Sequence, residues 1–355
     1  MYEEFMGTKP VAERMKVDLD ALSAYMHAHV PGFQGDLQIE QFKGGQSNPT
    51  FKLVSGSQRY VLRTKPAPAA KLLPSAHAIE REFRVMDALS KAGFPAAKQY
   101  ALCEDESVIG RAFYIMEFVD GRVLWDQSLP GMSNEDRAAH YDEMNRVIAQ
   151  LHSLDYQAVG LETFGKPGNY FQRQIDRWIR QYKAAETEPI PAMEHLIDWL
   201  PKHIPEGEIT TIVHGDYRLD NMIFHPTEPK ILAVLDWELS TLGHPLADFS
   251  YHCMSWHIEP GLFRGIGGLD LKSLGIPGKD EYIARYSERT GIPVNKEDFR
   301  FYLAYNMFRM AGILQGIMKR YQDGTAASEQ ALKSGQAAKP MAIMGWDYAS
   351  GARPV

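Results

Sequence analysis

Apolar and polar residues alternate through the first third of the chain, as expected for strands with one buried face. Three such segments are predicted as strands: 37–42, 50–54 and 59–63. A helix over 78–92 follows, because its apolar residues recur at helical spacing and Gly93 and Pro95 can end it. Two further strands are predicted over 99–103 and 111–119. The order is therefore three strands, a helix and two strands.

The pattern becomes mainly helical beyond Asp120-Gly121. Helical periodicity predicts a long helix that begins at Ser133 and further helices over 170–185, 246–257, 279–290 and 296–321. The exception is the continuous apolar run 231–235, which predicts a buried strand that ends at Asp236. Residues 1–17 and the tail from Ala326 show only weak patterns. The expected fold class is α+β.

Composition limits the partners of the chain. The net charge is −7, and the 38 basic residues form no long run, so we expect no binding of nucleic acid. Cys103 and Cys253 lie far apart without metal-ligand spacing, which indicates a reducing, cytoplasmic location. The sequence has neither an apolar stretch of the roughly 18 residues that a membrane helix needs nor a signal-peptide core, so no membrane association is expected.

The segment from His214 to Asn221 carries the candidate chemistry. Its sequence, HGDYRLDN, has the H-x-D-x-x-x-x-N spacing of a kinase catalytic loop. Phosphoryl transfer needs a carboxylate that orients and deprotonates an acceptor hydroxyl, and oxygen ligands that hold Mg²⁺ against nucleotide phosphates. Asp216 is the predicted base, and Asn221 and Asp236 are the predicted metal ligands. His214 is expected to brace the loop as a buried histidine and not to move protons.

Two motifs together carry a family resemblance. Asp236 to Asp248 has the form D-x-[DE]-x(4)-G-x-P-x-x-D, and with the upstream HGD block it resembles the aminoglycoside phosphotransferase-like family, which includes choline kinases. The segments GGQSNPTF (44–51), YVLR (60–63) and GRVLW (121–125) are similar to one branch, the kinase-like domain fused to some acyl-CoA dehydrogenases. The resemblance covers residues 37 to 320 approximately. It implies a protein-kinase-like, two-lobed fold with a nucleotide-binding N-lobe over 1–118 and a C-lobe over 119–355.

The resemblance also implies a nucleotide site for ATP and Mg²⁺. Gly45, Ser47 and Asn48 occupy the place of the phosphate-covering loop. Arg63 stands where most of the family has the lysine that binds the α- and β-phosphates; Lys65, on the same side of the strand, is the competing candidate. Glu82 matches the partner carboxylate on the helix, with Glu80 as the alternative.

Three further positions follow from the same resemblance. The main chain of Glu117 and Val119 is expected to bind adenine at the end of the last N-lobe strand. Glu238, in the third place of D-x-[DE], is expected to bind metal directly or through water. Asp248 is expected to accept N–H bonds from the catalytic loop and hold its shape.

The expected function is ATP- and Mg²⁺-dependent phosphorylation of a hydroxyl on a small metabolite. The alternatives are a non-catalytic, pseudokinase-like nucleotide-binding protein, which the arginine at position 63 favours, and a true aminoglycoside kinase. A protein kinase is disfavoured because H-R-D, D-F-G and A-P-E are missing from the sequence.

Basic and apolar residues on the two presumed substrate helices favour a hydroxyacyl-CoA as acceptor over an aminoglycoside. Ordinary solvated helix faces would carry the same residues. The basic residues concerned are Arg173, Arg177, Arg180, Lys183, Arg300, Arg309, Lys319 and Arg320. The sequence does not define the acceptor or the oligomeric state.

Overall fold

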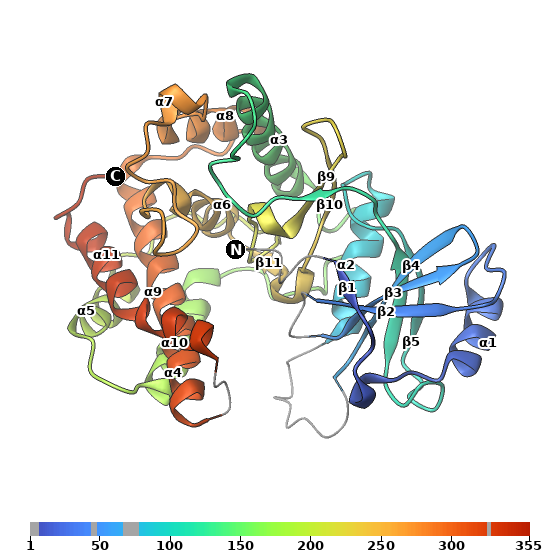
Figure 1. The fold of residues 1–355 in the computed structure, drawn as a ribbon. Coiled ribbons are helices and arrows are strands. Elements are labelled where there is room, and N and C mark those ends of the chain that lie inside the picture. Colours follow the sequence, from blue (N-terminus) through green and yellow to red (C-terminus); the bar gives the residue numbers. More distant parts are fainter. Residues whose placement is uncertain (1–6, 44–47, 67–77, 325–327) are drawn as a thin grey trace. The chain divides into compact units, whose positions relative to one another are not determined.

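The computed structural model describes residues 7–43, 48–66, 78–324 and 328–355 (Figure 1). The chain forms two compact units. The first unit comprises Met1–Trp125, Gln157–Phe164 and Asp220–Ser240, and the second comprises Asp126–Tyr156, Gly165–Leu219 and Thr241–Val355. The division falls inside the HGDYRLDN segment, between Leu219 and Asp220, so each unit carries part of the candidate site.

The first unit is built on an antiparallel sheet in which the strands follow the order β1-β2-β3-β4-β6-β5. The strands are β1 (Thr8–Lys9), β2 (Gln38–Phe42), β3 (Thr50–Ser55), β4 (Gln58–Thr64), β5 (Gln99–Cys103) and β6 (Phe113–Glu117). In β3 burial alternates residue by residue, as the sequence pattern predicts. The pairing of β3 with β4 places Thr50 opposite Arg63, and that of β4 with β6 places Arg63 opposite Tyr114.

Two helices belong to this unit, α1 (Leu19–His29) and α2 (Ile79–Lys91). Asp18 caps α1 by accepting from the Asp20 and Ala21 amides. Helix α1 contributes Leu22 and Met26 to an apolar core shared with strand residues such as Phe51, Leu62 and Ile115. Helix α2 packs against β5 and β6 and buries Glu82 together with its apolar residues.

A smaller sheet in the first unit has the order β10-β9-β7, from β7 (Arg122–Val123), β9 (Met222–Phe224) and β10 (Ile231–Val234). Gly121 makes the approach of β7 to β9 possible, because a Cβ at this position would lie 2.3 Å from the Phe224 carbonyl oxygen. Strands β9 and β10 form an antiparallel hairpin, so Asn221 precedes one arm and Asp236 follows the other.

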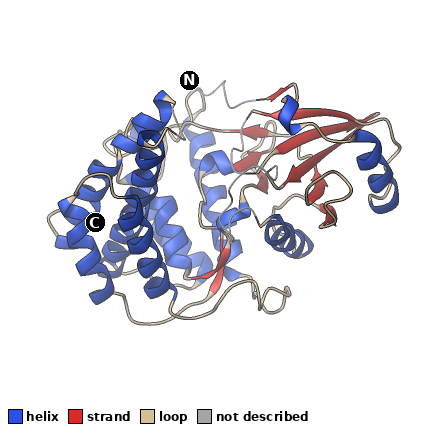
Figure 2. Ribbon diagram, turned by 90° about the horizontal axis from the view of Figure 1, so that it is seen from below, coloured by secondary structure: helices blue, strands red, loops and turns tan. Residues whose placement is uncertain are grey.

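The second unit is mainly helical (all helices are blue in Figure 2). Its helices are α3 (Asn134–Ser153), α4 (Tyr170–Ala185), α5 (Pro191–Trp199), α6 (Pro245–Cys253), α7 (Leu271–Leu274), α8 (Lys279–Thr290), α9 (Lys296–Gln322), α10 (Glu329–Gln336) and α11 (Ala338–Ser350). Helix α9 packs against α4, α6, α10 and α11 and buries residues on all sides of its first two thirds. Strands β8 (Thr211–Val213) and β11 (Thr241–Gly243) pair antiparallel.

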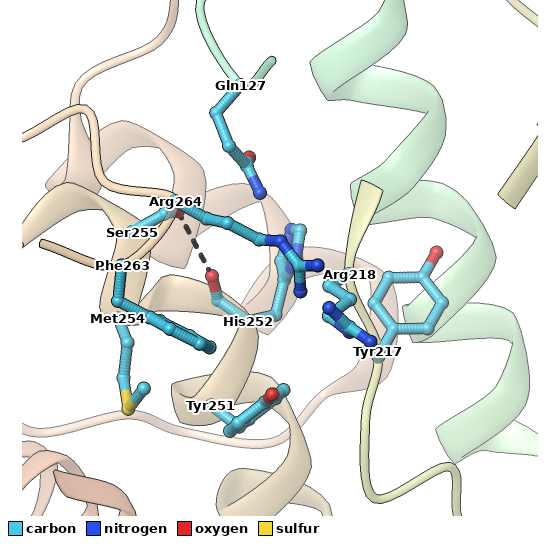
Figure 3. A pocket seen from close by; sticks show the side chains of 9 residues that line it. All are labelled: Gln127, Tyr217, Arg218, Tyr251, His252, Met254, Ser255, Phe263 and Arg264. Carbon is cyan, nitrogen blue, oxygen red and sulfur yellow. Dashed lines mark hydrogen bonds between the residues drawn. The ribbon is translucent and has the colours of Figure 1, made fainter. Parts of the chain in front are cut away.

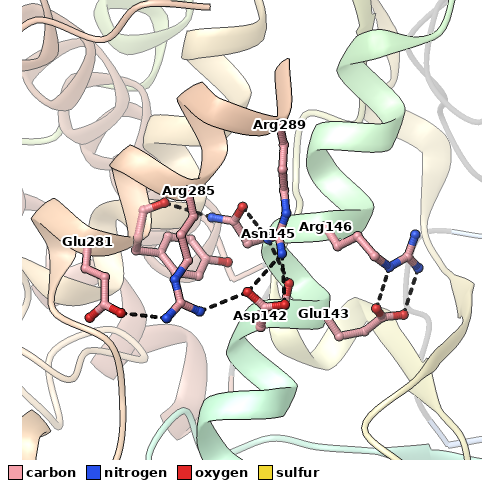
Figure 4. A network of polar contacts seen from close by, with 8 residues as sticks. Asp142, Glu143, Asn145, Arg146, Glu281, Arg285 and Arg289 are labelled. Carbon is pink, nitrogen blue, oxygen red and sulfur yellow. Dashed lines mark hydrogen bonds and ion pairs between the residues drawn. The ribbon is translucent and has the colours of Figure 1, made fainter. Parts of the chain in front are cut away.

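A network of charged side chains joins α3 to α8 in the second unit (Figure 4). Arg289 donates to both carboxylate oxygens of Asp142 at 2.8 and 2.9 Å, and Arg285 donates to Asp142 at 2.9 Å. Asn145 donates to the Tyr282 carbonyl oxygen at 2.8 Å and is buried. The network fastens α3 to α8.

The structure confirms the α+β class, with an antiparallel sheet followed by a mainly helical part. The elements that the sequence patterns did not predict include β1, β7 to β9, β11, α5, α7, α10 and α11. Strand β1 lies in the segment expected to be loosely held, where Arg111 also donates to the Met15 and Lys16 carbonyl oxygens at 3.1 Å. The weakly patterned tail forms α10 and α11. No helix in the described part of the chain is long and apolar enough to cross a bilayer.

Candidate active site

The first unit holds a buried ion pair between a strand and a helix. Arg63, on β4, places Nε 2.7 Å from Oε2 of Glu82 on α2. Their side chains are only 11% and 3% exposed. Burial opposes the charge on Arg63, but Tyr114, Glu82, Asp236 and Glu238 raise its pKa above the usual value, so Arg63 is cationic. Glu82 is therefore paired with Arg63, as predicted.

Two other side chains fix the Glu82 carboxylate. Asn48 Nδ2 donates to Oε1 at 2.7 Å, and the Tyr114 hydroxyl donates to Oε2 at 3.1 Å. Burial and the nearby Glu82 raise the pKa of Tyr114, which keeps this hydroxyl protonated as a donor. The Asn48 side chain, predicted to contact the nucleotide, is thus engaged with Glu82, and the residue is fully buried.

The competing candidates form a second ion pair, between the residue that follows β4 and helix α2. Lys65 lies 3.3 Å from Glu80, and these side chains are 34% and 38% exposed. Both pairs join a residue at the end of β4 to a glutamate on α2, but only the side chains of Arg63 and Glu82 are enclosed by protein. Because a phosphate-binding cation has to be held in one position, the buried pair is the better candidate for the predicted clamp.

Asp236 ends the hairpin beside Arg63. Its backbone has φ +66°, a left-handed conformation that is uncommon for residues other than glycine and is often found at functional sites. Its Oδ1 is buried, accepts no hydrogen bond, and lies 3.5 Å from Arg63 Nη2. The Leu235 amide donates to the Asn221 carbonyl oxygen at 2.7 Å, which brings the chain at Asn221 close to Asp236. Glu238 is exposed on the following turn, Trp237–Leu239.

These residues fit a magnesium ion that is held largely by phosphates. Within the described residues, no three His, Cys, Asp or Glu side chains gather as a metal site. Mg²⁺ usually takes one or two protein carboxylates and completes its octahedron with waters and substrate phosphates. A buried Asp236 oxygen without a hydrogen bond and the adjacent Asn221 are a donor set of this kind.

Other predicted nucleotide contacts are placed only in part. Gly45 and Ser47 lie outside the described residues. The Glu117 amide donates to the Lys98 carbonyl oxygen at 2.8 Å, so adenine could use this N–H only by breaking that bond. Val119 is half-buried just beyond the end of β6. The prediction of adenine binding is therefore narrowed to the Glu117 carbonyl oxygen and the Val119 main chain.

In the second unit, Asp248 shapes the start of the HGDYRLDN segment. Its carboxylate accepts the amides of His214 at 2.7 Å and Gly215 at 2.9 Å. His152 lies 3.2 Å away and, with His214, lowers the pKa of Asp248 although burial opposes this. His214 is fully buried, and its Nδ1 accepts the Asp216 amide at 3.1 Å. The predicted bracing roles of Asp248 and His214 agree with these contacts.

Asp216 itself is held at both carboxylate oxygens. The Tyr251 hydroxyl donates to Oδ1 at 2.5 Å, and Arg218 Nε donates to Oδ2 at 2.9 Å. Burial and Asp216 raise the pKa of Tyr251 well above its usual value, so the hydroxyl remains a donor. The side chain of Asp216 is still 17% exposed, which a base that meets an acceptor requires.

Arg309 supports this arrangement from α9. It is buried, donates to the Gly215 carbonyl oxygen at 2.7 Å, and places its guanidinium 5.3 Å from the centre of the Tyr251 ring. Burial lowers the pKa of Arg309, but surrounding tyrosines and Asp216 raise it overall. The sequence pattern named Arg309 only as an acceptor anchor, and here it lies beneath the loop.

The other basic residues of α4 and α9 are mostly tied to neighbours. Lys183 pairs with Glu194 at 2.5 Å, Arg300 with Glu297 at 3.2 Å and Lys319 with Asp323 at 2.9 Å. Arg173 donates to the Lys166 carbonyl oxygen. These contacts match ordinary helix surfaces, so the positive charge on the two helices is weak support for an acyl-CoA site.

Comparison with known proteins defines the family. Residues 38–293, which make up most of the chain, match the phosphotransferase enzyme family. The chain belongs to this family. The phosphotransferase is 47% identical over 347 residues to acyl-CoA dehydrogenase family member 10 of Mus musculus, a match that covers 97% of this chain and 32% of that protein. It thus spans about a third of that relative, and the predicted likeness to acyl-CoA dehydrogenase fusions is confirmed.

Solved structures confirm the fold of the phosphotransferase. A protein of Ralstonia eutropha, provisionally assigned as an aminoglycoside phosphotransferase, is 66% identical with a TM-score of 0.88, covering 95% of this chain and 99% of that one. Aminoglycoside phosphotransferase APH(4)-Ia, solved with ADP and hygromycin B, is 15% identical with a TM-score of 0.59, covering 92% and 99%. The second likeness concerns the fold alone.

Proposed function

We propose that the phosphotransferase moves the γ-phosphoryl group of ATP, with Mg²⁺, to a hydroxyl of a small metabolite. The observation that carries this proposal is the buried Arg63–Glu82 pair beside Asp236, in a chain whose second unit holds Asp216 at both carboxylate oxygens.

Each candidate residue has a separate role in the proposed reaction. Arg63, fixed by Glu82, binds nucleotide phosphate oxygens through its planar fork. Asn221 and Asp236 would hold Mg²⁺, with Glu238 next to them, and an ion bound there would supply neutralising charge for the phosphates. Asp216 accepts the proton of the acceptor hydroxyl, and the donors on its two oxygens fix its orientation toward that hydroxyl.

The finer proposal for the acceptor is a hydroxyacyl-CoA or a similar metabolite. The similarity to acyl-CoA dehydrogenase family member 10 supports it. A second candidate is an aminoglycoside, which the provisional assignment of the Ralstonia eutropha relative favours. Aminoglycosides carry several ammonium groups, however, and would need an acidic site.

The test is ADP formation by the purified chain with Mg²⁺ and ATP. Medium-chain hydroxyacyl-CoAs and kanamycin-type aminoglycosides are supplied separately, and Asp216→Asn serves as the control for contaminating kinases. We expect acceptor-dependent ADP formation with hydroxyacyl-CoA that disappears in the control. Turnover of aminoglycosides alone would overturn the acceptor proposal, and nucleotide binding without any turnover would favour the pseudokinase alternative.

A further inference from the structure

The peptide bond that precedes Asp216 is held at both of its polar atoms. The Gly215 carbonyl oxygen accepts from Arg309 Nη2 at 2.7 Å, and the Asp216 amide donates to His214 Nδ1 at 3.1 Å. These atoms belong to one planar peptide unit, so the two contacts together fix its orientation. Gly215 has φ +86°, and glycine adopts many backbone conformations. Contacts with side chains, and not a preference of the backbone, therefore set the direction in which the Asp216 side chain leaves the loop.

Arg309 also reaches the carboxylate of Asp216 by a second route. Tyr251, on α6, donates to one carboxylate oxygen and Arg218 to the other; Figure 3 shows both donors. The Arg309 guanidinium lies 5.3 Å from the centre of the Tyr251 ring and 5.7 Å from that of Trp178. Attraction between the cation and the Tyr251 ring opposes movement of the hydroxyl that holds Asp216.

Stability alone does not explain a cation at this position. Arg309 is 8% exposed, and within the described residues no carboxylate forms an ion pair with it. The Asp216 carboxylate is paired with Arg218 instead, at 2.9 Å. Burial of a charge without an ion-pair partner is costly. The contacts that Arg309 does make are with the Gly215 carbonyl oxygen and two aromatic rings, and two of these three contacts lead to Asp216.

We propose that Arg309 is a positioning residue for Asp216 and not an anchor for the acceptor. It acts through the Gly215–Asp216 peptide and through Tyr251, and both set the direction of the Asp216 carboxylate. A small displacement of a catalytic group can lower the rate by about a hundredfold. The inference rests on the proposed function, because it takes Asp216 as the base.

The first experiment measures the loop and needs no turnover. Hydrogen exchange, followed by mass spectrometry, compares the full wild-type chain with Arg309→Met. The Gly215 and Asp216 amides, which are hydrogen-bonded in the loop, should exchange at least about tenfold faster in the variant, because a hydrogen bond with a charged donor contributes at least about that factor. Peptides from α3 and α8 should exchange at the wild-type rate. Wild-type exchange at residues 214–216, or an equal increase in α3 and α8, would overturn the inference.

The second experiment measures turnover with Mg·ATP and with medium-chain hydroxyacyl-CoA or kanamycin, whichever the wild type phosphorylates. In Arg309→Met, kcat should fall by about tenfold to a hundredfold, while KM for each substrate should change by less than about threefold. A higher KM for the acceptor with kcat unchanged would overturn the inference, since Arg309 would then be an acceptor anchor. If the wild type phosphorylates neither acceptor, hydrogen exchange decides the inference, and the failure belongs to the proposed function.

Three further variants separate positioning from a general loss of structure. Arg309→Lys keeps a charged donor for the Gly215 carbonyl oxygen and should retain most of kcat. Arg309→Gln removes the charge but stays polar, and it should reproduce both changes even if the methionine variant does not fold. Arg285→Met removes an arginine from the α3–α8 network and should leave kcat and exchange in the loop unchanged. Wild-type kcat in Arg309→Gln, or an equal fall in Arg309→Gln and Arg285→Met, would overturn the inference.

Discussion

The candidate residues of the two units have opposite charge arrangements. In the first unit a single cation, Arg63, lies among Glu82, Asp236 and Glu238, so the group has an excess of negative charge. In the second unit a single carboxylate, Asp216, is surrounded by Arg218, Arg309 and the Tyr251 hydroxyl. The first group is suited to take up a cation with its nucleotide, and the second to restrain a base.

The largest effect should come from the carboxylate of the second unit. Asp216→Asn keeps the size of the side chain but removes the base, so kcat should fall at least about a hundredfold. Binding of Mg·ATP, measured by calorimetry, should be unchanged because the variant leaves the first unit intact. Near wild-type turnover would remove Asp216 from its proposed role.

The next largest effect should come from the carboxylates around Arg63 in the first unit, where negative charge is in excess. Asp236→Ala deletes a proposed metal ligand, so Mg²⁺-dependent ATP affinity should fall by at least about 10–100-fold, the loss seen even for residues that only support a metal ligand. Titrations with and without Mg²⁺ separate this loss from a general one. Unchanged affinity in the presence of Mg²⁺ would refute the assignment.

The parallel ion pairs of the first unit offer a matched comparison. Arg63→Ala leaves Glu82 buried without its cation and should cost about 3–5 kcal/mol of unfolding free energy. Lys65→Ala breaks a half-exposed pair and should cost less than about 1 kcal/mol. Denaturant unfolding measures both, and nucleotide affinity should fall in the same order. The reverse order would make Lys65 the phosphate clamp.

Mild acid should weaken the second unit before the first. Burial lowers the pKa of His244 to about 4, of His252 to about 4 and of His257 to about 3, and all three lie in the second unit. They stay neutral when folded, while the unfolded chain gains protons below its histidine pKa of about 6.5.

The stability that they contribute is therefore complete above pH 6.5 and is lost as the pH falls toward 4, up to roughly 3 kcal/mol for each. Hydrogen exchange compared at pH 7 and pH 5, corrected for the intrinsic rate, should show greater loss of protection in the second unit. Equal loss in both units would contradict this account.

Tyr251→Phe should have the smallest effect. It removes one donor from Asp216 and leaves Arg218 and the ring contact with Arg309 in place. We expect a decrease in kcat of about tenfold or less, with KM for the acceptor little changed, since one hydrogen bond contributes about 1 kcal/mol. A KM for the acceptor that rises by a similar factor, with kcat unchanged, would show that Tyr251 contacts the acceptor and does not position Asp216.

The sequence predicted the elements whose pattern is dictated by burial. Strands β3 to β6 and helices α4, α8 and α9 match the expected ranges closely, because alternating or helical periodicity extends over their full length. Strand β1 has only two residues, too few for a period, and was missed. Helices α10 and α11 were missed because their Ala- and Gly-rich sequence carries little pattern and they pack against α9.

Part of the candidate site was predictable from motifs. The Arg63–Glu82 pair and the contacts of Asp248 were implied by the resemblance of those motifs to a known family. Tyr114 and Tyr251 were not found, since an aromatic residue in a strand or helix has the pattern of core. Their roles depend on contacts between residues distant in sequence, such as Tyr251 with Asp216, which no periodicity reports.

The most direct test of the phosphoryl-transfer account follows the γ-phosphoryl group itself. The full chain is incubated with Mg²⁺ and ATP carrying ¹⁸O in the γ-phosphoryl group, together with a pool of hydroxylated carboxylates, phosphates and acyl-CoAs, and the products are identified by mass spectrometry. The account predicts an acceptor that gains the labelled phosphoryl group, and no such product with Asp216→Asn. Label found only in ATP and inorganic phosphate, with the nucleotide bound, would contradict it.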